Sequence, residues 1–398
     1  MATFNSADPI VILSYARTPM GAMQGALADV AATDLGATAV KAAMERAGVA
    51  GEDVDRVYMG CVLPAGLGQA PARQAALKAG LPLSAQATTV NKVCGSGMQT
   101  VIMGSEALAS GGADVIVAGG MESMTNAPYL LKKHRGGARL GHDTAYDHMF
   151  LDGLEDAYKA GTAMGAYAQD MANEYSLTRE DMDTYAITSL ERANAAIASG
   201  AFADEIAPVT YTTRKGEVTV DTDEGPGNGR PDKIPQLRPA FAKDGTITAA
   251  TSSSISDGAA AMVLTRKSVA EDKGLSPVAT VVATAAHAQD PAAFTTAPVG
   301  AINKALEKAG WSVDDVNLWE VNEAFACVAM FAMKDIGIAH DKINVNGGGT
   351  ALGHPIGASG ARIIVTLINA LKQQGKKRGV AALCIGGGEG TAIAVELA

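Results

Sequence analysis

The chain has 398 residues, 47% of them hydrophobic, which is enough for two to three domains with filled apolar cores. Its net charge of −10 argues against a general nucleic-acid surface, because phosphate backbones are held by clustered Lys and Arg. We find no run of about 18 uncharged apolar residues, which argues against a transmembrane helix. The opening residues MATFNSADPIVILSYARTP have no basic segment followed by an apolar core, so we expect a cytoplasmic protein without a secretory signal.

The cysteine and glycine contents indicate which kinds of functional site to expect in this chain. The four cysteines, Cys61, Cys94, Cys327 and Cys384, lie far apart and never form a CxxC pair, so we expect reduced thiols and neither a metal site nor a disulfide framework. Glycine is enriched, with 45 residues or about 11% of the chain, against a usual level of about 7%. This enrichment predicts many close approaches of one backbone to another.

In chain order, two segments of the first half recur in the second. Residues 43–60 (AMERAGVAGEDVDRVYMG) match residues 305–322 without a gap, each as an amphipathic helix, a loop and a strand. Residues 94–123 resemble residues 357–390, each with a glycine-flanked helix start, a helix and a buried strand that ends in glycines. Alternating helices and apolar strands predict two similar α/β halves with mainly parallel sheets.

Residues 125–248 differ in composition and look like an insertion. A helix is expected after Thr178, which has the side chain of an N-cap, and polar, turn-rich segments follow that helix. The insertion is a candidate cover for a substrate, because recognition often lies on loops carried by a rigid scaffold. Its basic stretch from Leu130 to Arg139 is either a local anion contact or a solvated face.

Cys94 stands at the start of the helix expected near Gly95 or Ser96. First-turn amides and the helix dipole favour a thiolate there, which predicts a lowered pKa and a reactive cysteine. The alternative is a small buried core residue. The glycines around Cys94 would let a substrate carbonyl approach and would leave the Cys94 amide free to act as an oxyanion donor.

Three further positions could complete a site with Cys94. His354, in GGGTALGHPIGASGAR, is either a base for the cysteine or the filling of a buried turn, and Gly357 corresponds to Cys94 in the repeat, so this loop should lie near Cys94. Cys384 closes an apolar strand before GGGEG; no helix follows as a dinucleotide motif needs, so a second acid/base thiol fits better. Asn322 is either a helix N-cap or the holder of a water or oxygen.

The motifs VCGSGMQ, NEAFA, GGGTALGHPIGASG and CIGGGEG, in this order, resemble those of the thiolase family over nearly the whole chain. The resemblance implies an α/β fold of two βαβαβαββ halves in five αβαβα layers, with an inserted loop domain. The first half would comprise residues 1–124 and 249–275, the insertion 125–248, and the second half 276–398. It also implies a homo-oligomer, either a dimer or a dimer of dimers, with the stretch from Lys132 to Arg139 in the region that builds the tetramer.

The resemblance further implies reversible condensation of two acetyl-CoA into acetoacetyl-CoA and CoA, an activity of fatty acid metabolism. Cys94 would attack the thioester, His354 would help to take its proton, and Cys384 would deprotonate the methyl of the second acetyl-CoA. One oxyanion site would consist of His354 and a water held by Asn322, and the other of the Cys94 and Gly386 amides. Acyl-CoA and CoA would be the only small-molecule partners, and no cofactor is expected.

The resemblance also implies substrate contacts, and the sequence matches these less completely than it matches the catalytic motifs. Ser253, in TAATSSSISDGAA, stands where a serine contacts the CoA pantetheine, and Met164 and Phe325 fall on the expected substrate surface. The arginine that often stacks on the adenine is not cleanly matched, since Arg230 is displaced by a few positions.

Two other positions depart from the family pattern and leave the substrate open. Ala163 replaces a histidine, and Phe294 stands where short-chain members often carry methionine. A thiolase for longer 3-ketoacyl-CoA is therefore one alternative. A non-catalytic acyl-CoA binding protein and a decarboxylating ketoacyl synthase are the others, although the second cysteine argues against the synthase.

Overall fold

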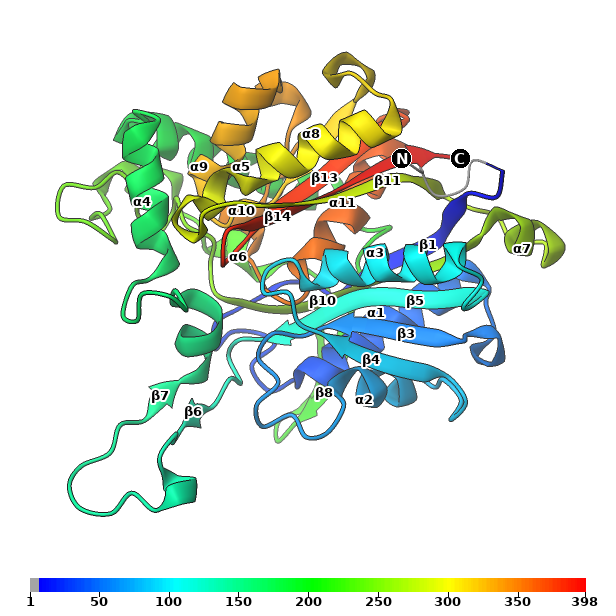
Figure 1. Cartoon of the computed structure of the whole chain (residues 1–398), viewed down its shortest axis with the longest axis horizontal. Helices are drawn as coiled ribbons and strands as arrows, with labels where there is room; N and C mark the ends of the chain where they lie inside the picture. Colours follow the sequence, from blue (N-terminus) through cyan, green and yellow to red (C-terminus); the bar gives the residue numbers. More distant parts are fainter. Residues whose placement is uncertain (1–6) are drawn as a thin grey trace.

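The computed structural model describes residues 7–398, and a ten-stranded sheet crosses this part of the chain. In the amino-terminal half the strands are β1 (Ile10–Arg17), β2 (Gly21–Ala22), β3 (Arg56–Gly60), β4 (Gln86–Val90), β5 (Val115–Ser123) and β10 (Ser256–Arg266). In the carboxy-terminal half they are β11 (Ala279–Ala288), β12 (Leu318–Val321), β13 (Arg378–Ile385) and β14 (Glu389–Leu397). The order is β12-β13-β14-β11-β1-β10-β5-β3-β4, with β2 beside β10, so the halves join where β1 pairs with β11 (Figure 1).

The expectation of mainly parallel sheets is wrong. Pairing is parallel between β3 and β4, β3 and β5, and β12 and β13, whereas β1–β10, β1–β11, β5–β10, β11–β14 and β13–β14 are antiparallel. β13 and β14 are joined by a tight turn in which Gly387 and Gly388 adopt φ values of 94° and 87°, and so short a connection reverses the chain. A fully buried strand is apolar whether it runs parallel or antiparallel to its neighbours, so its composition does not predict its direction.

Helices form the other layers of the fold. Their bounds are α1 (Ala32–Ala47), α2 (Pro71–Lys78), α3 (Ser96–Ala109), α7 (Lys267–Asp272), α8 (Ala297–Ala309), α9 (Ala326–Ala332), α10 (Gly349–Leu352) and α11 (Ser359–Gln373). α1 and α2 cover the outer face of the amino-terminal half-sheet, and α8 and α9 cover that of the carboxy-terminal half-sheet. α3 and α11 pack together between the two half-sheets, which confirms the five αβαβα layers.

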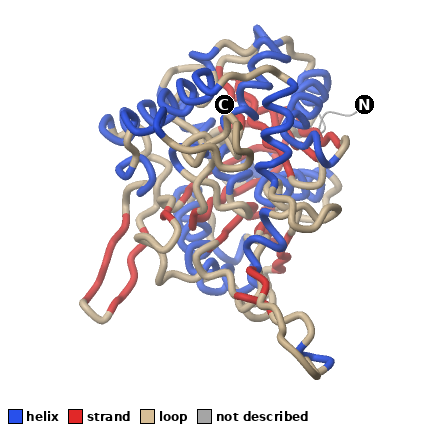
Figure 2. Tube along the Cα trace, turned by 90° about the vertical axis from the view of Figure 1, so that its left-hand side faces the viewer, coloured by secondary structure: helices blue, strands red, loops and turns tan. Residues whose placement is uncertain are grey.

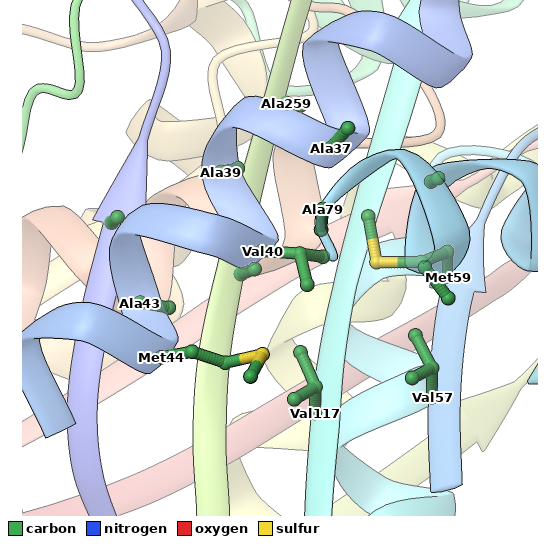
Figure 3. Packing of buried hydrophobic residues seen from close by; sticks show 14 of the residues in the cluster. Ala37, Ala39, Val40, Ala43, Met44, Val57, Met59, Ala79, Val117 and Ala259 are labelled. Carbon is green, nitrogen blue, oxygen red and sulfur yellow. The ribbon is translucent and has the colours of Figure 1, made fainter. Parts of the chain in front are cut away.

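The outer and central layers differ in how much of each helix is buried. Val40 and Met44 of α1 face Val57 of β3 and Val117 of β5 in one apolar cluster (Figure 3), as expected for an amphipathic helix on a sheet. The central helix α11 is buried on all sides from Ser359 onward for most of its length. It therefore brings its amino terminus, and the loop before it, into the interior.

The internal repeat is confirmed in its first part. α1 and α8 both end at a left-handed glycine, Gly48 (φ 66°) and Gly310 (φ 67°), and a short 3-10 turn then leads to β3 and β12 respectively. The copies differ next, because a single parallel bridge between Trp319 and Ile343 stands where β4 stands in the first copy. The second part of the repeat is also confirmed, since α3 leads to β5 parallel to β3, and α11 leads to β13 parallel to β12.

The insertion lies between β5 and β10. Its elements are β6 (Tyr129–Leu130), β7 (Tyr146–Asp147), α4 (Met164–Glu174), α5 (Arg179–Ser199), β8 (Val209–Thr213), β9 (Gly216–Val220) and α6 (Glu224–Asn228). Thr178 caps α5 as expected, in a reciprocal capping box with Asp181. The β6–β7 arm and the β8–β9 hairpin both extend from the body (Figures 1 and 2). The domain boundaries given above remain predictions.

None of the helices in residues 7–398 combines the length and the apolar character that a membrane span requires. Residues 1–6, on which the expectation of no secretory signal partly rests, lie outside the described range.

Candidate active site

Cys94 sits on a strained turn between β4 and α3. The preceding residue, Val93, has φ 47°, a left-handed conformation that is costly for a β-branched side chain, on the order of 1–3 kcal/mol. Side chains hold the turn: the Val93 amide donates to Asn91 Oδ1 at 3.0 Å, and Ser96 Oγ accepts from the Lys92 amide at 2.8 Å and donates to the Val93 carbonyl at 2.7 Å. The turn presents Cys94 at the amino terminus of α3, where the sequence had placed the helix start.

The predicted lowering of the Cys94 pKa is wrong. Burial raises the pKa of Cys94 to about 11, although hydrogen bonds from the Gly386 amide and from its own amide act in the opposite direction. The covering residues include Leu63, Met149 and Ile356, which form an apolar cluster against Cys94. Cys94 is half-buried, and the loss of water around it outweighs the helix dipole, which favours the thiol form at rest.

Cys384 is the penultimate residue of β13 and lies next to Cys94. It is fully buried, and burial raises its pKa well above the usual value, with the neighbouring Cys94 adding to the effect. Two residues later, the Gly386 amide donates to Cys94. A Cβ on Gly386 would stand 3.6 Å from Met164 Cε, so Met164 of the insertion covers this strand end.

His354 is buried in the loop that leads into α11. Its Nδ1 lies 2.6 Å from Ser359 Oγ and 3.4 Å from Asn322 Nδ2, while its Nε2 has no hydrogen-bond partner among the described residues. Burial, with a smaller effect of the Arg362 charge, lowers the pKa of His354 to about 3. The imidazole is therefore neutral over the whole neutral pH range.

The orientation of the Ser359 hydroxyl determines whether Nε2 of the neutral His354 ring is a hydrogen-bond donor or an acceptor. Ser359 Oγ lies 2.9 Å from the Pro355 carbonyl as well as 2.6 Å from His354 Nδ1. When the hydroxyl donates to the carbonyl, Nδ1 carries the ring proton and Nε2 is an acceptor. When the hydroxyl turns to Nδ1, Nε2 becomes the donor.

Asn322 is not a helix cap, because Phe325 occupies the N-cap position of α9. Asn322 follows β12, its Nδ2 faces His354, and its buried Oδ1 has no partner among the described residues. Ser253 lies alongside, since its amide donates to the Ala324 carbonyl at 2.9 Å, and the amide of His354 donates to the Ser254 carbonyl at 3.1 Å. The 253–254 segment thus joins the two loops that carry Asn322 and His354.

Aromatic rings form a wall near Cys384. Phe325 makes edge-to-face contacts with Phe241 and Phe294, at centroid distances of 5.9 Å and 6.5 Å, and Phe294, Phe325 and Cys384 belong to one buried cluster. Arg230 instead bonds back to its own loop through the Gly229 carbonyl at 2.9 Å. It lines a cavity of about 220 Å³ with Ala250 and Thr350, beside the segments that carry Ser253 and His354.

The structure therefore brings Cys94 and Cys384 together with the Gly386 amide, places Asn322 against His354, and brings the loop that carries His354 to Cys94 through Ile356, which packs in the apolar cluster against the cysteine. The close contact of α3 with the start of α11 is what aligns them: a Cβ on Gly97 would lie 2.7 Å from the Ala361 amide and 3.1 Å from the Gly357 carbonyl. Only glycine permits this approach.

Comparison with known proteins identifies the family of the chain. The sequence model of the thiolase N-terminal domain matches residues 10–268, and that of the thiolase C-terminal domain matches residues 275–397. This chain belongs to the thiolase family. It is 50% identical over 392 residues to the acetyl-CoA acetyltransferase of Rhizobium meliloti (98% of this chain, 99% of the relative) and 50% identical over 388 residues to that of Escherichia coli (97% and 98%). The crystal structure of the Bacillus anthracis acetyl-CoA acetyltransferase superposes with a TM-score of 0.95 at 40% identity, over 98% of this chain and 99% of that one.

Three residues that support this thiolase site were not singled out in the sequence. Ser359 bonds to His354, and Glu122 bonds to the loop between them. Glu323 is fully buried and accepts hydrogen bonds from Tyr185 and Ser189 of α5, which anchors the insertion beside Asn322. Their signal was a carboxylate or hydroxyl inside an otherwise apolar, glycine-rich motif: GGMES, NEAFA and GASGA.

Proposed function

We propose that this chain is an acetyl-CoA C-acetyltransferase, which condenses two acetyl-CoA reversibly into acetoacetyl-CoA and CoA through an acetyl group on Cys94. The observation that supports the proposal is that two thiols, Cys94 and Cys384, lie beside each other with the Gly386 amide donating to Cys94, while the loop that carries His354 packs against Cys94 through Ile356. The names of the relatives from Rhizobium meliloti and Escherichia coli support the same activity.

Acylation begins with Cys94 attacking the thioester carbonyl as its proton passes to His354 Nε2. Burial favours the neutral form of both groups, with a pKa of about 11 for Cys94 and about 3 for His354, so full proton transfer in the resting enzyme is unfavourable. A preformed thiolate–imidazolium pair is therefore not the resting state. Proton transfer accompanies attack on the carbonyl, which removes the negative charge from sulfur as it forms.

The departing CoA thiolate takes the proton of Cys384 and leaves as the free thiol. Cys384 is then a thiolate next to the His354 imidazolium. Its raised pKa makes it a strong base, suited to the weakly acidic methyl of the second acetyl-CoA.

Condensation returns both protons. Cys384 takes a proton from the methyl, and the enolate carbon attacks the acetyl carbonyl on Cys94, which forms the C–C bond of acetoacetyl-CoA. The bond to Cys94 sulfur breaks, and His354 returns its proton to that sulfur. The enzyme is left in its starting state.

Two sets of donors stabilise the oxyanions in this scheme. His354 Nε2 and a water held by Asn322 face the enolate oxygen, while the Cys94 and Gly386 amides face the oxygen of the acetyl group on Cys94. Removing one donor of this kind costs about 3–4 kcal/mol of transition-state stabilisation in well-studied enzymes. Ser253, Met164 and Phe325 would line the pantetheine path, and Arg230 remains a candidate contact for the CoA nucleotide.

Acyl-chain length separates this proposal from a thiolase for longer 3-ketoacyl-CoA. The Phe294 and Phe325 rings pack in the same buried cluster as Cys384, which favours a short acyl group over a long one. The test is thiolytic cleavage, comparing kcat/KM for acetoacetyl-CoA with that for a 3-ketoacyl-CoA of about ten carbons. We expect the four-carbon substrate to be preferred; turnover of the longer substrate alone would overturn the proposal.

A homo-oligomer and a cytoplasmic location are also part of this proposal. β4 ends the sheet, and its outer edge pairs with no other strand of the described chain, so a second copy could extend the sheet there. The β6–β7 arm exposes Leu131 and Leu140 next to its basic residues, which suits a further contact between dimers. Sedimentation equilibrium distinguishes monomer, dimer and tetramer, and cell fractionation tests the location.

A further inference from the structure

A buried carboxylate that the reaction scheme does not use connects the two halves next to the site. Glu122 lies near the end of β5 and is fully buried. Its Oε2 accepts from the Val62 amide at 2.9 Å and from the Gly357 amide at 2.9 Å. Its Oε1 accepts from the Leu63 amide at 3.1 Å and from the Cys61 thiol at 3.6 Å.

These donors belong to the two segments that flank the reacting groups. Val62 and Leu63 are part of the apolar cover on Cys94. Gly357 lies in the 354–359 segment, between His354 and the Ser359 hydroxyl that contacts it. One carboxylate therefore bonds both to the cover of Cys94 and to the loop that carries His354.

The same loop is also held by close backbone packing. A Cβ on Gly60 would lie 2.6 Å from the Gly357 carbonyl oxygen, and a Cβ on Gly120 would lie 2.0 Å from it. The amino-terminal half thus holds Gly357 through both its amide and its carbonyl. A loop of the carboxy-terminal half takes its position from the half that carries Cys94.

A carboxylate suits this position better than an amide. Glu122 has two oxygens, and each accepts from two donors. A glutamine has one oxygen, so its NH₂ group would face backbone amides that also need an acceptor.

We propose that Glu122 is a positioning residue, which sets the place of His354 relative to Cys94 by holding Gly357 and the 62–63 segment together. This inference rests on the proposed function, because it matters only if His354 and Cys94 react together. Displacement of a catalytic group by about 1 Å typically costs about 100-fold in rate.

The negative charge of Glu122 has a second effect, which opposes the first: positioning speeds the reaction, whereas the charge makes the Cys94 thiol less acidic. Burial raises the pKa of Glu122 to about 7, and the Glu122 charge contributes to the raised pKa of Cys94. Loss of the charge should therefore make the Cys94 thiol more acidic, while loss of position makes the enzyme slower. A change that loosened the fold would also lower the pH midpoint of Cys94 alkylation, because it would expose the thiol to water, so the shift reports the Glu122 charge only where the thermal midpoint of the variant stays near that of wild type.

The test compares Glu122→Gln with Asp257→Asn. Asp257 is also a fully buried carboxylate whose pKa is raised by burial, and it lies on the neighbouring strand β10, opposite Ser123. It bonds to Ser123 Oγ at 3.2 Å and to the Thr125 amide at 3.0 Å, and neither of these partners belongs to the 354–359 segment. The measurements are kcat and KM for thiolysis of acetoacetyl-CoA, the thermal midpoint, and the pH dependence of Cys94 alkylation by iodoacetamide.

For Glu122→Gln we expect kcat to fall about 100-fold, KM to stay within about threefold, and the alkylation midpoint to move to lower pH. For Asp257→Asn we expect kcat within about threefold of wild type. Near-normal kcat in Glu122→Gln, or equal losses in both variants, would overturn the inference. If Glu122→Gln does not fold, Glu122→Asp serves in its place: it keeps the charge and withdraws it by one methylene, so kcat must fall without a shift of the alkylation midpoint.

Wild-type protein separates this inference from the proposed function. If the wild-type protein does not catalyse thiolysis of acetoacetyl-CoA, the proposed function is overturned. Active wild type with an equally active Glu122→Gln variant overturns only the role of Glu122.

Discussion

The protonation state of Cys94 is the prediction that departs furthest from the sequence pattern. With a pKa of about 11, the thiolate fraction at pH 7 is about 1 in 10,000, whereas a free cysteine with a pKa near 8.5 is about 3% ionised. Cys94 of the free enzyme should then react with iodoacetamide about 300-fold more slowly at pH 7 than a small-molecule thiol. Its rate should rise roughly tenfold per pH unit between pH 7 and pH 9.5.

The assay follows alkylation of the peptide that contains Cys94 by mass spectrometry at several pH values, with no substrate present. Cys94→Ser is the control, because it shows how far the buried thiols Cys61, Cys327 and Cys384 contribute. A rate that levels off below about pH 8 would show a thiolate in the resting enzyme. That result would contradict the argument that burial outweighs the helix amino terminus.

Three further changes test the supports of the site. Gly357→Ala should destabilise the fold by about 1–3 kcal/mol in urea unfolding, because the added Cβ would lie 2.6 Å from its nearest neighbour. Gly227→Ala is the control: a Cβ there has no atom within 4 Å, so the free energy of unfolding should change by less than about 0.5 kcal/mol. Equal effects of the two variants would contradict the packing argument. Ser359→Ala should lower kcat at least about tenfold with little change in KM, since His354 loses the partner that orients its ring proton, and an unchanged kcat would refute that role. Thr178→Ala should cost about 1 kcal/mol of stability through the lost capping box and leave kcat unchanged; a loss of kcat at constant stability would contradict a purely structural role.

Local patterns predicted the elements of the fold well. The helix, turn and strand of each repeat copy follow from apolar periodicity and from glycines such as Gly48 and Gly310, which act over only a few residues. The repeat register also placed the His354 loop beside Cys94, because Gly357 and Cys94 occupy equivalent helix starts. Strand direction escaped prediction, since it depends on how the connections are routed.

What the sequence could not supply is the environment of each side chain. The pKa of Cys94 depends on a cover assembled from Leu63, Met149 and Ile356, which are far apart in the chain. The partners of Glu122 are likewise up to 235 positions away. Such contacts follow only from the three-dimensional packing of the two halves and the insertion.

The central claim is that Cys94 carries the acyl group while Cys384 moves the proton. The most direct test is mass spectrometry of the protein after brief exposure to acetoacetyl-CoA, in wild type, Cys94→Ser and Cys384→Ser. We predict an acetyl group on the Cys94 peptide of wild type and none at that position in Cys94→Ser. We also predict that Cys384→Ser, acylated with acetyl-CoA, holds the acetyl group on Cys94 and forms no acetoacetyl-CoA. An acetyl group on another residue of the wild type, or condensation that persists without the Cys384 thiol, would contradict the account.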